Sequence, residues 1–484
     1  MKYAPSAAAL CAALSVAACA TNPVTGQKEY SLMSEAQEVQ LGQEMDPQVR
    51  AEMGLYPDAG LQEYVQGVGM RLAKASERPD LSWHFAVVDV PAVNAFALPG
   101  GYIYITRGLL AHLDNEAEMA GVLGHEIGHV TARHAARAYT RQASVGIGAA
   151  VTSIFFPEAA PYAAAAQTGL GVLFLKYDRN QEVQSDSLGA RYAATAGWQP
   201  SGMSGVLETL GRISATADRR GVPNWLATHP QPADRVIKVS AEVEALEATR
   251  PASQWTVNRE GYWQRLNGLL YGDNPREGVV RGREFIHPDV RFRLAFPEGW
   301  TIENGKQQVT ARPAEVRDAM MVLELVPEAQ GTSLDAVAAG SMGKAGFTRL
   351  GGESTRLNGI PAYVGVYDGQ TQDGQALRVR AAHIRLERQV LLLAGIASQS
   401  RYPQAERAFG DAIRSFAPLD AAEAARIKPN RLGFTTVRSG ETWPGIAART
   451  GGVIPASELA VLNGFAANSQ PPAGQRIKIV IAGE

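Results

Sequence analysis

Apolar residues near the start of the chain follow two different periods. Over residues 34–53 and 61–75 they recur every three or four positions, which predicts two amphipathic helices. The segments LSWHFAVVDV (81–90) and YIYIT (102–106) are apolar and rich in β-branched and aromatic residues, which predicts two strands. The combination predicts helices packed around a small sheet.

A long helix is predicted to follow these strands. Asn115 can cap its first turn, Glu118 would complete a capping box, and the helix would continue through Ala136 or beyond. Residues 143–177 contain only short uncharged stretches, below the roughly twenty residues of a spanning helix. They predict a buried or membrane-facing helical hairpin, with a transmembrane pair as the alternative. Three more helices are predicted at 180–196, 200–216 and 233–248.

The pattern changes after Arg250. A bridging segment at 251–288 leads to a strand-rich region, 289–419, in which VRFRLAF, YVGVYD, LRVRAAHIRL and QVLLLAGIAS are apolar or alternating runs. A polar linker at 420–433 precedes a small module at 434–484. The predicted fold class is α+β: a mostly helical domain with a small sheet, an α/β sandwich, and a small module.

Composition narrows the possible functions. The chain has 484 residues, which at about 150 residues per domain suggests roughly three domains. It carries 46 basic and 48 acidic residues, a formal charge of −2, and this balance argues against a nucleic-acid partner. Its two cysteines are Cys11 and Cys19. Later residues therefore form no disulfide and no cysteine-ligated zinc site.

The N-terminus has the features of a secretory signal. Residues 7–18 are an apolar run after one lysine, too short to span a bilayer as a helix. The run ends in VAAC and resembles a bacterial lipobox. That resemblance implies removal of residues 1–18, acylation of Cys19 and, since Ala20 is not aspartate, a place at the periplasmic face of the outer membrane of a Gram-negative bacterium. The alternative is an ordinary secretory signal with a chance cysteine.

The segment GHEIGH carries the strongest chemical signal. His125 and His129 are four residues apart on a predicted helix, so both imidazoles lie on one face and can share a metal ion. Glu126 is placed to reach a metal-bound water. Other apolar residues of this helix supply a separate packing stripe, so the histidines are not needed to fill a core.

A catalytic zinc needs a third protein ligand. The metzincin position six residues after His129 is Ala135, and His134 is one residue out of register. Glu182, at the start of the next predicted helix, is the candidate, and Asp186 one turn later could hydrogen-bond a ligand imidazole. The alternative is an ordinary solvated helix start with two acids.

These motifs together resemble a known family. HEIGH, the later ExxxD helix and the preceding NAFALPGG look like the gluzincin metallopeptidases related to the CAAX prenyl endopeptidases, numbered forty-eight among metallopeptidase families, and like their periplasmic lipoprotein-type members. The resemblance covers roughly residues 22–250 and implies a zincin domain at 19–250 with one Zn²⁺. The implied site residues are the zinc ligands His125, His129 and Glu182, the general base Glu126 and the orienting partner Asp186.

The resemblance also implies a reaction and a substrate site. Zinc would lower the pKa of a bound water, and Glu126 would take its proton and return it to the leaving amine. Extended substrate would pair with an edge strand at 101–106, reached through the substrate-binding residues Asn94, Ala95, Phe96 and Ala97. His229 and Arg235 are candidate oxyanion donors. In the family the histidine can also occupy the open zinc position as a switch, and the alternative is a capping histidine before a proline turn.

Two further resemblances concern the C-terminal half. Residues 289–419 resemble a PsbP/Mog-like α/β sandwich, for which we expect a binding or positioning role. Residues 434–480, from VRSGETW to GQRIKI, resemble a LysM module, which implies a βααβ fold and possible binding of peptidoglycan. A degenerate, purely structural module is the alternative.

The predicted function is that of a zinc-dependent endopeptidase. It would hydrolyse peptide bonds of periplasmic or outer-membrane proteins, in envelope protein quality control, and would be held at the membrane by its lipid anchor. The alternative is a largely latent, cell-wall-associated binding or chaperone-like lipoprotein. An integral-membrane prenyl endopeptidase is disfavoured by the lack of spanning segments.

Overall fold

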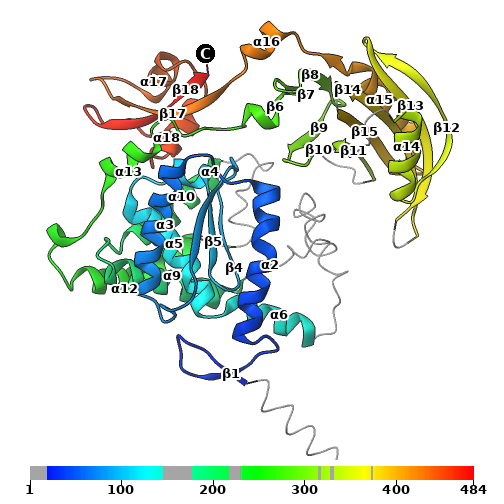
Figure 1. Ribbon diagram of the computed structural model, residues 1–484. Helices are drawn as coiled ribbons and strands as arrows, with labels where there is room; N and C mark the ends of the chain where they lie inside the picture. Colours follow the sequence, from blue (N-terminus) through cyan, green and yellow to red (C-terminus); the bar gives the residue numbers. More distant parts are fainter. Residues whose placement is uncertain are drawn as a thin grey trace, which may run out of the picture. The chain divides into compact units, whose positions relative to one another are not determined.

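The structure is a computed structural model. It describes residues 19–144, 177–216, 229, 232–313, 318–327, 332–371, 374–387 and 389–483 (Figure 1). The predicted signal segment and most of the predicted hairpin at 143–177 lie outside these residues. Within the described ranges, every helix is too short or too polar to cross a membrane.

Contacts divide the chain into two compact units. The first extends to Tyr271 and includes Arg431–Ile481, and the second comprises Gly272–Asn430 with Ala482–Glu484. The α+β fold class is confirmed, with helices dominating the first unit and sheets the second. The LysM-like residues therefore belong to the same compact unit as the HEIGH helix.

The first unit is built on a three-stranded sheet. Its strands are β3 (His84–Val88), β4 (Ala95–Leu98) and β5 (Tyr102–Thr106), in the order β3-β5-β4, with β3 parallel and β4 antiparallel to β5. β5 is therefore the central strand, and the expectation that it forms an edge was wrong. β4 had not been predicted as a strand, because it is only four residues long. It is an edge strand whose outer side pairs with no other strand among the described residues.

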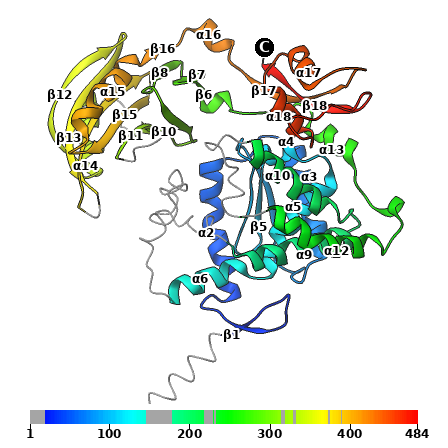
Figure 2. The same cartoon turned by 180° about the vertical axis from the view of Figure 1, so that it is seen from behind.

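Helices cover both faces of this sheet (Figure 2). Met45 and Val49 of α2 (Glu35–Met53) pack on the face that carries Phe96 and Tyr104. Residues of the opposite face, such as Ile103, join the larger core with α3 (Ala59–Lys74) and α5 (Glu116–Thr131). Because both faces are buried, the strands read as continuous apolar runs.

The long predicted helix is two helices. Asn115 caps α5 as predicted, but Glu118 accepts a hydrogen bond from the Asp114 backbone N–H at 2.7 Å, so the predicted capping box does not form. α5 ends at Thr131, the chain turns at Arg133 with φ 56°, and α6 (His134–Ser144) begins. The Arg133 guanidinium donates to Glu38 at 2.6 Å and to the Met33 carbonyl at 2.7 Å, which stabilises this turn.

The other predicted helices of the first unit are confirmed within two residues. These are α9 (Arg179–Thr195), α10 (Gly202–Thr216) and α12 (Pro232–Glu247). The structure adds the short elements β1 (Cys19–Thr21), β2 (Lys28–Tyr30), α4 (Arg107–His112) and α13 (Arg259–Leu266).

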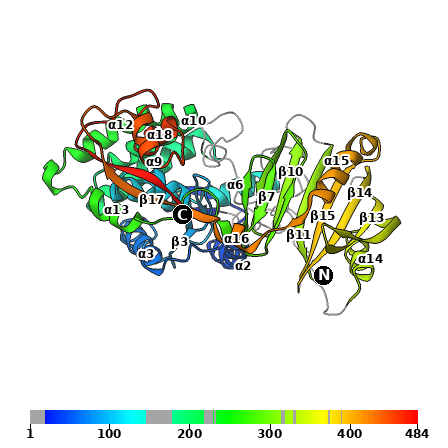
Figure 3. The same cartoon turned by 90° about the horizontal axis from the view of Figure 1, so that it is seen from above.

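The second unit contains a seven-stranded antiparallel sheet and a four-stranded one (Figure 3). Val337 of α14 (Leu334–Lys344) packs on one face of the seven-stranded sheet, and Phe409 of α15 (Tyr402–Ser415) packs on the other. The large sheet comprises, in order, β12 (Thr348–Leu357), β13 (Ile360–Gln370), β14 (Ala376–Leu386), β15 (Gln389–Ser398), β11 (Ala319–Val326), β10 (Gln308–Pro313) and β9 (Trp300–Asn304). The small sheet comprises β16 (Ala417–Pro418), β8 (Phe292–Ala295), β7 (Glu284–His287) and β6 (Val279–Arg281); the helices are α14 (Leu334–Lys344), α15 (Tyr402–Ser415) and α16 (Ala421–Ala425).

The C-terminal module has the predicted βααβ order. Its elements are β17 (Lys428–Thr436), α17 (Trp443–Arg449), α18 (Ala456–Leu462) and β18 (Arg476–Gly483). Leu462 and Val480 are buried in the same core as the sheet and α5. The fully buried Lys478 ammonium donates to the carbonyls of residues 111, 112 and 113 at 3.0–3.3 Å, at the C-terminal end of α4. Burial lowers its pKa to about 8.

Replacing this buried lysine tests whether the module is part of the first unit. We expect Lys478→Met to lower the free energy of unfolding by about 2–4 kcal/mol, because the carbonyls at the end of α4 lose a charged donor while buried. Chemical denaturation measures the effect. The control is Lys238→Met, at an exposed position of α12, which should stay within about 0.5 kcal/mol of the wild type. Equal stability of the two variants would contradict this prediction.

Candidate metal centre

Glycines let the HEIGH helix and α9 approach each other closely. A Cβ on Gly124 would lie 2.9 Å from the Gly189 backbone, and one on Gly189 would lie 2.8 Å from the backbone nitrogen of His125. A side chain at either position would push the helices apart. The glycines therefore place the carboxylates of α9 within reach of the histidines of α5.

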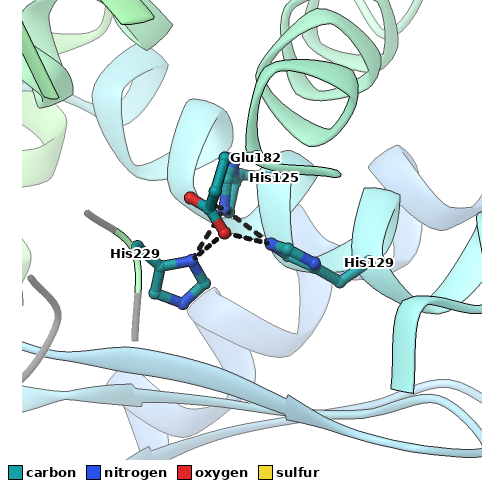
Figure 4. Close-up of side chains that lie close together, drawn as sticks. All are labelled: His125, His129, Glu182 and His229. Carbon is teal, nitrogen blue, oxygen red and sulfur yellow. Dashed lines mark hydrogen bonds and ion pairs between the residues drawn. The ribbon is translucent and has the colours of Figure 1, made fainter. Parts of the chain in front are cut away.

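Four side chains converge between these helices (Figure 4). His125, His129, Glu182 and His229 each offer a nitrogen or oxygen, and these atoms all lie within 4.8 Å of one another. The Nε2 atoms of His125 and His129 are 2.9 Å apart. Glu182 Oε1 is 3.4 Å from His129 Nε2 and 2.9 Å from His229 Nδ1. All four residues are buried.

The donor set fits a zinc ion. Nitrogen and oxygen ligands bind zinc at about 2.0–2.2 Å in tetrahedral geometry, so they stand about 3.3–3.5 Å from one another. Contacts of 2.9 to 3.8 Å between nitrogen and oxygen atoms of the four side chains bracket this value. Glu126 adds a second indication: its Oε1 is buried without a hydrogen-bond partner among the described residues, 3.8 Å from His229 Nε2.

Asp186 and Arg235 support this cluster through hydrogen bonds and ion pairs to its members. His125 Nδ1 donates to Asp186 at 2.9 Å, which leaves its Nε2 for the metal. Arg235 of α12 makes a two-pronged contact with Asp186, at 2.6 and 2.7 Å, and its third nitrogen lies 2.6 Å from Glu182. Because this guanidinium is occupied by two carboxylates, the arrangement favours a positioning role for Arg235. Its expected role as an oxyanion donor stays a prediction.

Electrostatics place the side chains in the forms that bind cations. Burial raises the pKa of Glu182, but the nearby His229, through its charge and its hydrogen bond, holds it well below its ordinary value. Burial lowers the pKa of His129 far below the usual range, so its imidazole is neutral. Burial raises the pKa of Glu126, which makes this carboxylate a stronger base.

The predicted substrate-binding residues lie along the edge strand. Asn94 precedes β4, Ala95 and Phe96 are within it, and Ala97 lines a hollow together with His129. The Asn94 side-chain oxygen is buried without a hydrogen-bond partner among the described residues. Of Cys19 the structure describes only the backbone, as the first residue of β1.

Sequence reasoning missed two neighbours of His129. The ring of Tyr177 stacks on it with centroids 3.9 Å apart, and His134 Nδ1 lies 2.9 Å from its Nδ1. In a continuous helix, a residue five positions later points about 140° away. Only the turn at Arg133 brings His134 back, and no glycine or proline marked that turn in the sequence.

A buried HExxH helix against an ExxxD helix, beside a small sheet, defines a domain of the gluzincin metallopeptidase class. Residues 60–243 match Peptidase family M48, and residues 435–480 match the LysM domain. The chain thus carries an M48 peptidase domain and a LysM domain, as the sequence motifs predicted.

Two curated relatives are similar over less than half of this chain. The beta-barrel assembly-enhancing protease of Escherichia coli (strain K12) is 32% identical over 224 residues, 45% of this chain and 46% of its own length. The mitochondrial metalloendopeptidase OMA1 of Arabidopsis thaliana is 34% identical over 175 residues, 36% of this chain and 34% of its own length. The chain therefore spans less than half the length of each of these two relatives.

A solved structure matches about a third of the chain. The cyanobacterial PsbP from Synechocystis is 13% identical, with a TM-score of 0.24, and the match covers 31% of this chain and 99% of that one. At this TM-score the PsbP/Mog-like expectation for the second unit stays a prediction.

The close approach of α5 and α9 can be tested with one methyl group. We expect Gly189→Ala to lower the free energy of unfolding by about 1–3 kcal/mol and to weaken metal binding, because the added Cβ meets backbone atoms. Thermal unfolding and chelator competition would measure the two effects. The matched control is Gly211→Ala in α10, where a Cβ meets nothing within 4 Å and helix propensity favours alanine. Unchanged metal binding in Gly189→Ala would disprove the role of this contact.

Proposed function

We propose that the protein is a zinc-dependent endopeptidase. The observation that carries this proposal is the buried group of His125, His129, Glu182 and His229, beside which one oxygen of Glu126 has no hydrogen-bond partner among the described residues. His125, His129 and Glu182 would hold one Zn²⁺. Bound there, the zinc would act as a Lewis acid toward water and the peptide carbonyl. Asp186 and Arg235 orient these ligands.

Glu126 supplies the proton transfers of the reaction. Its carboxylate is buried, its raised pKa favours proton uptake, and one oxygen has no other hydrogen-bond partner among the described residues. It takes a proton from the attacking water and delivers it to the leaving amine, so the peptide C–N bond breaks and two neutral products can leave.

An extended substrate pairs with the outer edge of β4. This strand presents backbone groups that no other described strand occupies, and it is the closest strand to the HEIGH helix by its contacts with α5. Main-chain hydrogen bonds to an edge bind a peptide with little regard to its sequence. Asn94, Ala95, Phe96 and Ala97 then contact substrate, and the free Asn94 side-chain oxygen accepts a hydrogen bond from it.

The substrates and location follow from the wider chain. The lipobox-like sequence, through Cys19, would anchor the protein to the outer membrane on its periplasmic face, and the LysM domain would hold it to peptidoglycan. Two acyl chains or more give stable anchoring. Relatives are named for beta-barrel assembly, which supports substrates among envelope proteins and a role in their quality control.

The role of Glu126 is tested by removing its charge alone. We expect Glu126→Gln to lower cleavage of an unfolded protein by about 10²–10⁴-fold, because the proton acceptor is lost, while one zinc per chain is retained. Cleavage assays and metal analysis measure the two quantities. Glu118→Gln, at a buried glutamate on the same helix outside the cluster, serves as control. Normal activity in Glu126→Gln would rule out this mechanism.

A second candidate function is that of a largely latent binding protein. His229 offers a nitrogen to the same group of atoms as the three proposed ligands, 3.3 Å from His125 Nε2. In this position it would take the coordination site that water needs, and the peptidase would be held inactive.

Activity of a His229 variant separates the two candidates. If His229 caps the zinc, His229→Ala should raise peptidase activity about tenfold, the gain expected when the latch is closed in about nine molecules of ten. Zinc content, measured in parallel, should stay at one per chain. If activity is unchanged or falls, the latch does not exist and His229 acts in catalysis or structure.

A further inference from the structure

His134 is a buried histidine that the proposed mechanism does not use. It is the first residue of α6, its side chain has no exposed surface, and it is not one of the grouped ligand residues. Its Nδ1 lies 2.9 Å from Nδ1 of His129, the ring nitrogen that faces away from the cluster. On its other side, His134 Nε2 lies 3.0 Å from Gln184 Oε1.

The donor and the acceptor of each hydrogen bond between Gln184, His134 and His129 can be assigned from Arg137. Arg137 lies 3.5 Å from Gln184 Oε1 and a guanidinium can only donate, so the oxygen of the Gln184 side chain faces this side. His134 must then donate from Nε2 to that oxygen. A neutral imidazole that donates from one nitrogen accepts at the other, so His134 Nδ1 is an acceptor.

The last hydrogen bond of this series joins His134 to the proposed metal ligand His129. With His134 Nδ1 as the acceptor, His129 donates from its own Nδ1, and its Nε2 is left as a lone pair that points into the cluster. The Ser185 hydroxyl, 3.4 Å from His134 Nδ1, agrees with this order because it can donate to the same nitrogen. His125 is fixed in the same tautomer by the carboxylate of Asp186.

We propose that His134 is a positioning residue for the metal site. By accepting the Nδ1–H of His129, it holds that ring in the orientation and tautomer in which Nε2 binds the metal. The inference rests on the proposed zinc site, and it assigns the two ligand histidines different supports: His125 a charged carboxylate, His129 a neutral imidazole. The turn at Arg133 places His134, the first residue of α6, beside His129.

Zinc affinity of the full chain, measured by competition with a chromophoric chelator, tests the proposal. His134→Leu keeps the bulk but removes the acceptor, and we expect affinity to fall about 10–100-fold, as for other partners of ligand histidines. In His134→Asn the side-chain oxygen can take the place of Nδ1, and affinity should recover to within about threefold of the wild type. His112→Leu, at a half-buried histidine bonded to the Gly108 carbonyl, is the matched control.

A second variant keeps the test valid if His134→Leu does not fold. Gln184→Leu leaves His134 in place but removes the oxygen that orders its protons, and we expect about three- to tenfold weaker binding. Wild-type affinity in His134→Leu or Gln184→Leu would overturn the proposal, as would His134→Asn binding no better than His134→Leu. A wild-type chain that binds no zinc would instead refute the proposed function itself.

Discussion

Two carboxylates, Glu182 and Asp186, are buried beside the histidines of the HEIGH helix, and the single positive charge of Arg235, which pairs with both, offsets part of their charge. Removing an ion from water costs several kcal/mol, which only close, well-oriented partners offset. Arg235 comes from α12 and the carboxylates from α9, so the metal site requires both helices to be packed in register. These ion pairs hold Glu182 in place, and Figure 4 shows that it faces the three imidazoles of the proposed metal site.

Close packing and a sharp turn supply the rest of the site. Glycines at 124 and 189 remove the side chains that would separate α5 from α9. The turn at Arg133 is strained for a non-glycine residue, because left-handed conformations cost roughly 1–2 kcal/mol. The buried ion pair with Glu38 of α2 opposes that cost. One helix end thus connects the metal ligands, the covering helix α2 and the imidazole of His134.

A buried charge also joins the LysM domain to the rest of the first unit. Its buried Lys478 is bonded to the carbonyls of residues 111–113, immediately before the Asn115 cap of α5. Its Leu462 and Val480 share the core of the peptidase domain. A module expected to be separate is therefore bound to the segment from which the HEIGH helix begins. Stacking of Trp263 on Phe434, with centroids 5.0 Å apart, adds an aromatic contact to this interface.

Local patterns in the sequence were enough to predict most of the helices and the class of the site. Helical periodicity located α2, α3, α9, α10 and α12, and the HEIGH and ExxxD spacings selected His125, His129, Glu182 and Asp186, because residues four apart on a helix share a face. Tertiary structure alone decided that β4 is the edge strand, that the long helix breaks after Thr131, and that Arg235 and His134 support the site. These features depend on contacts between residues far apart in the chain or across an unmarked turn, and local periodicity carries no information about such contacts.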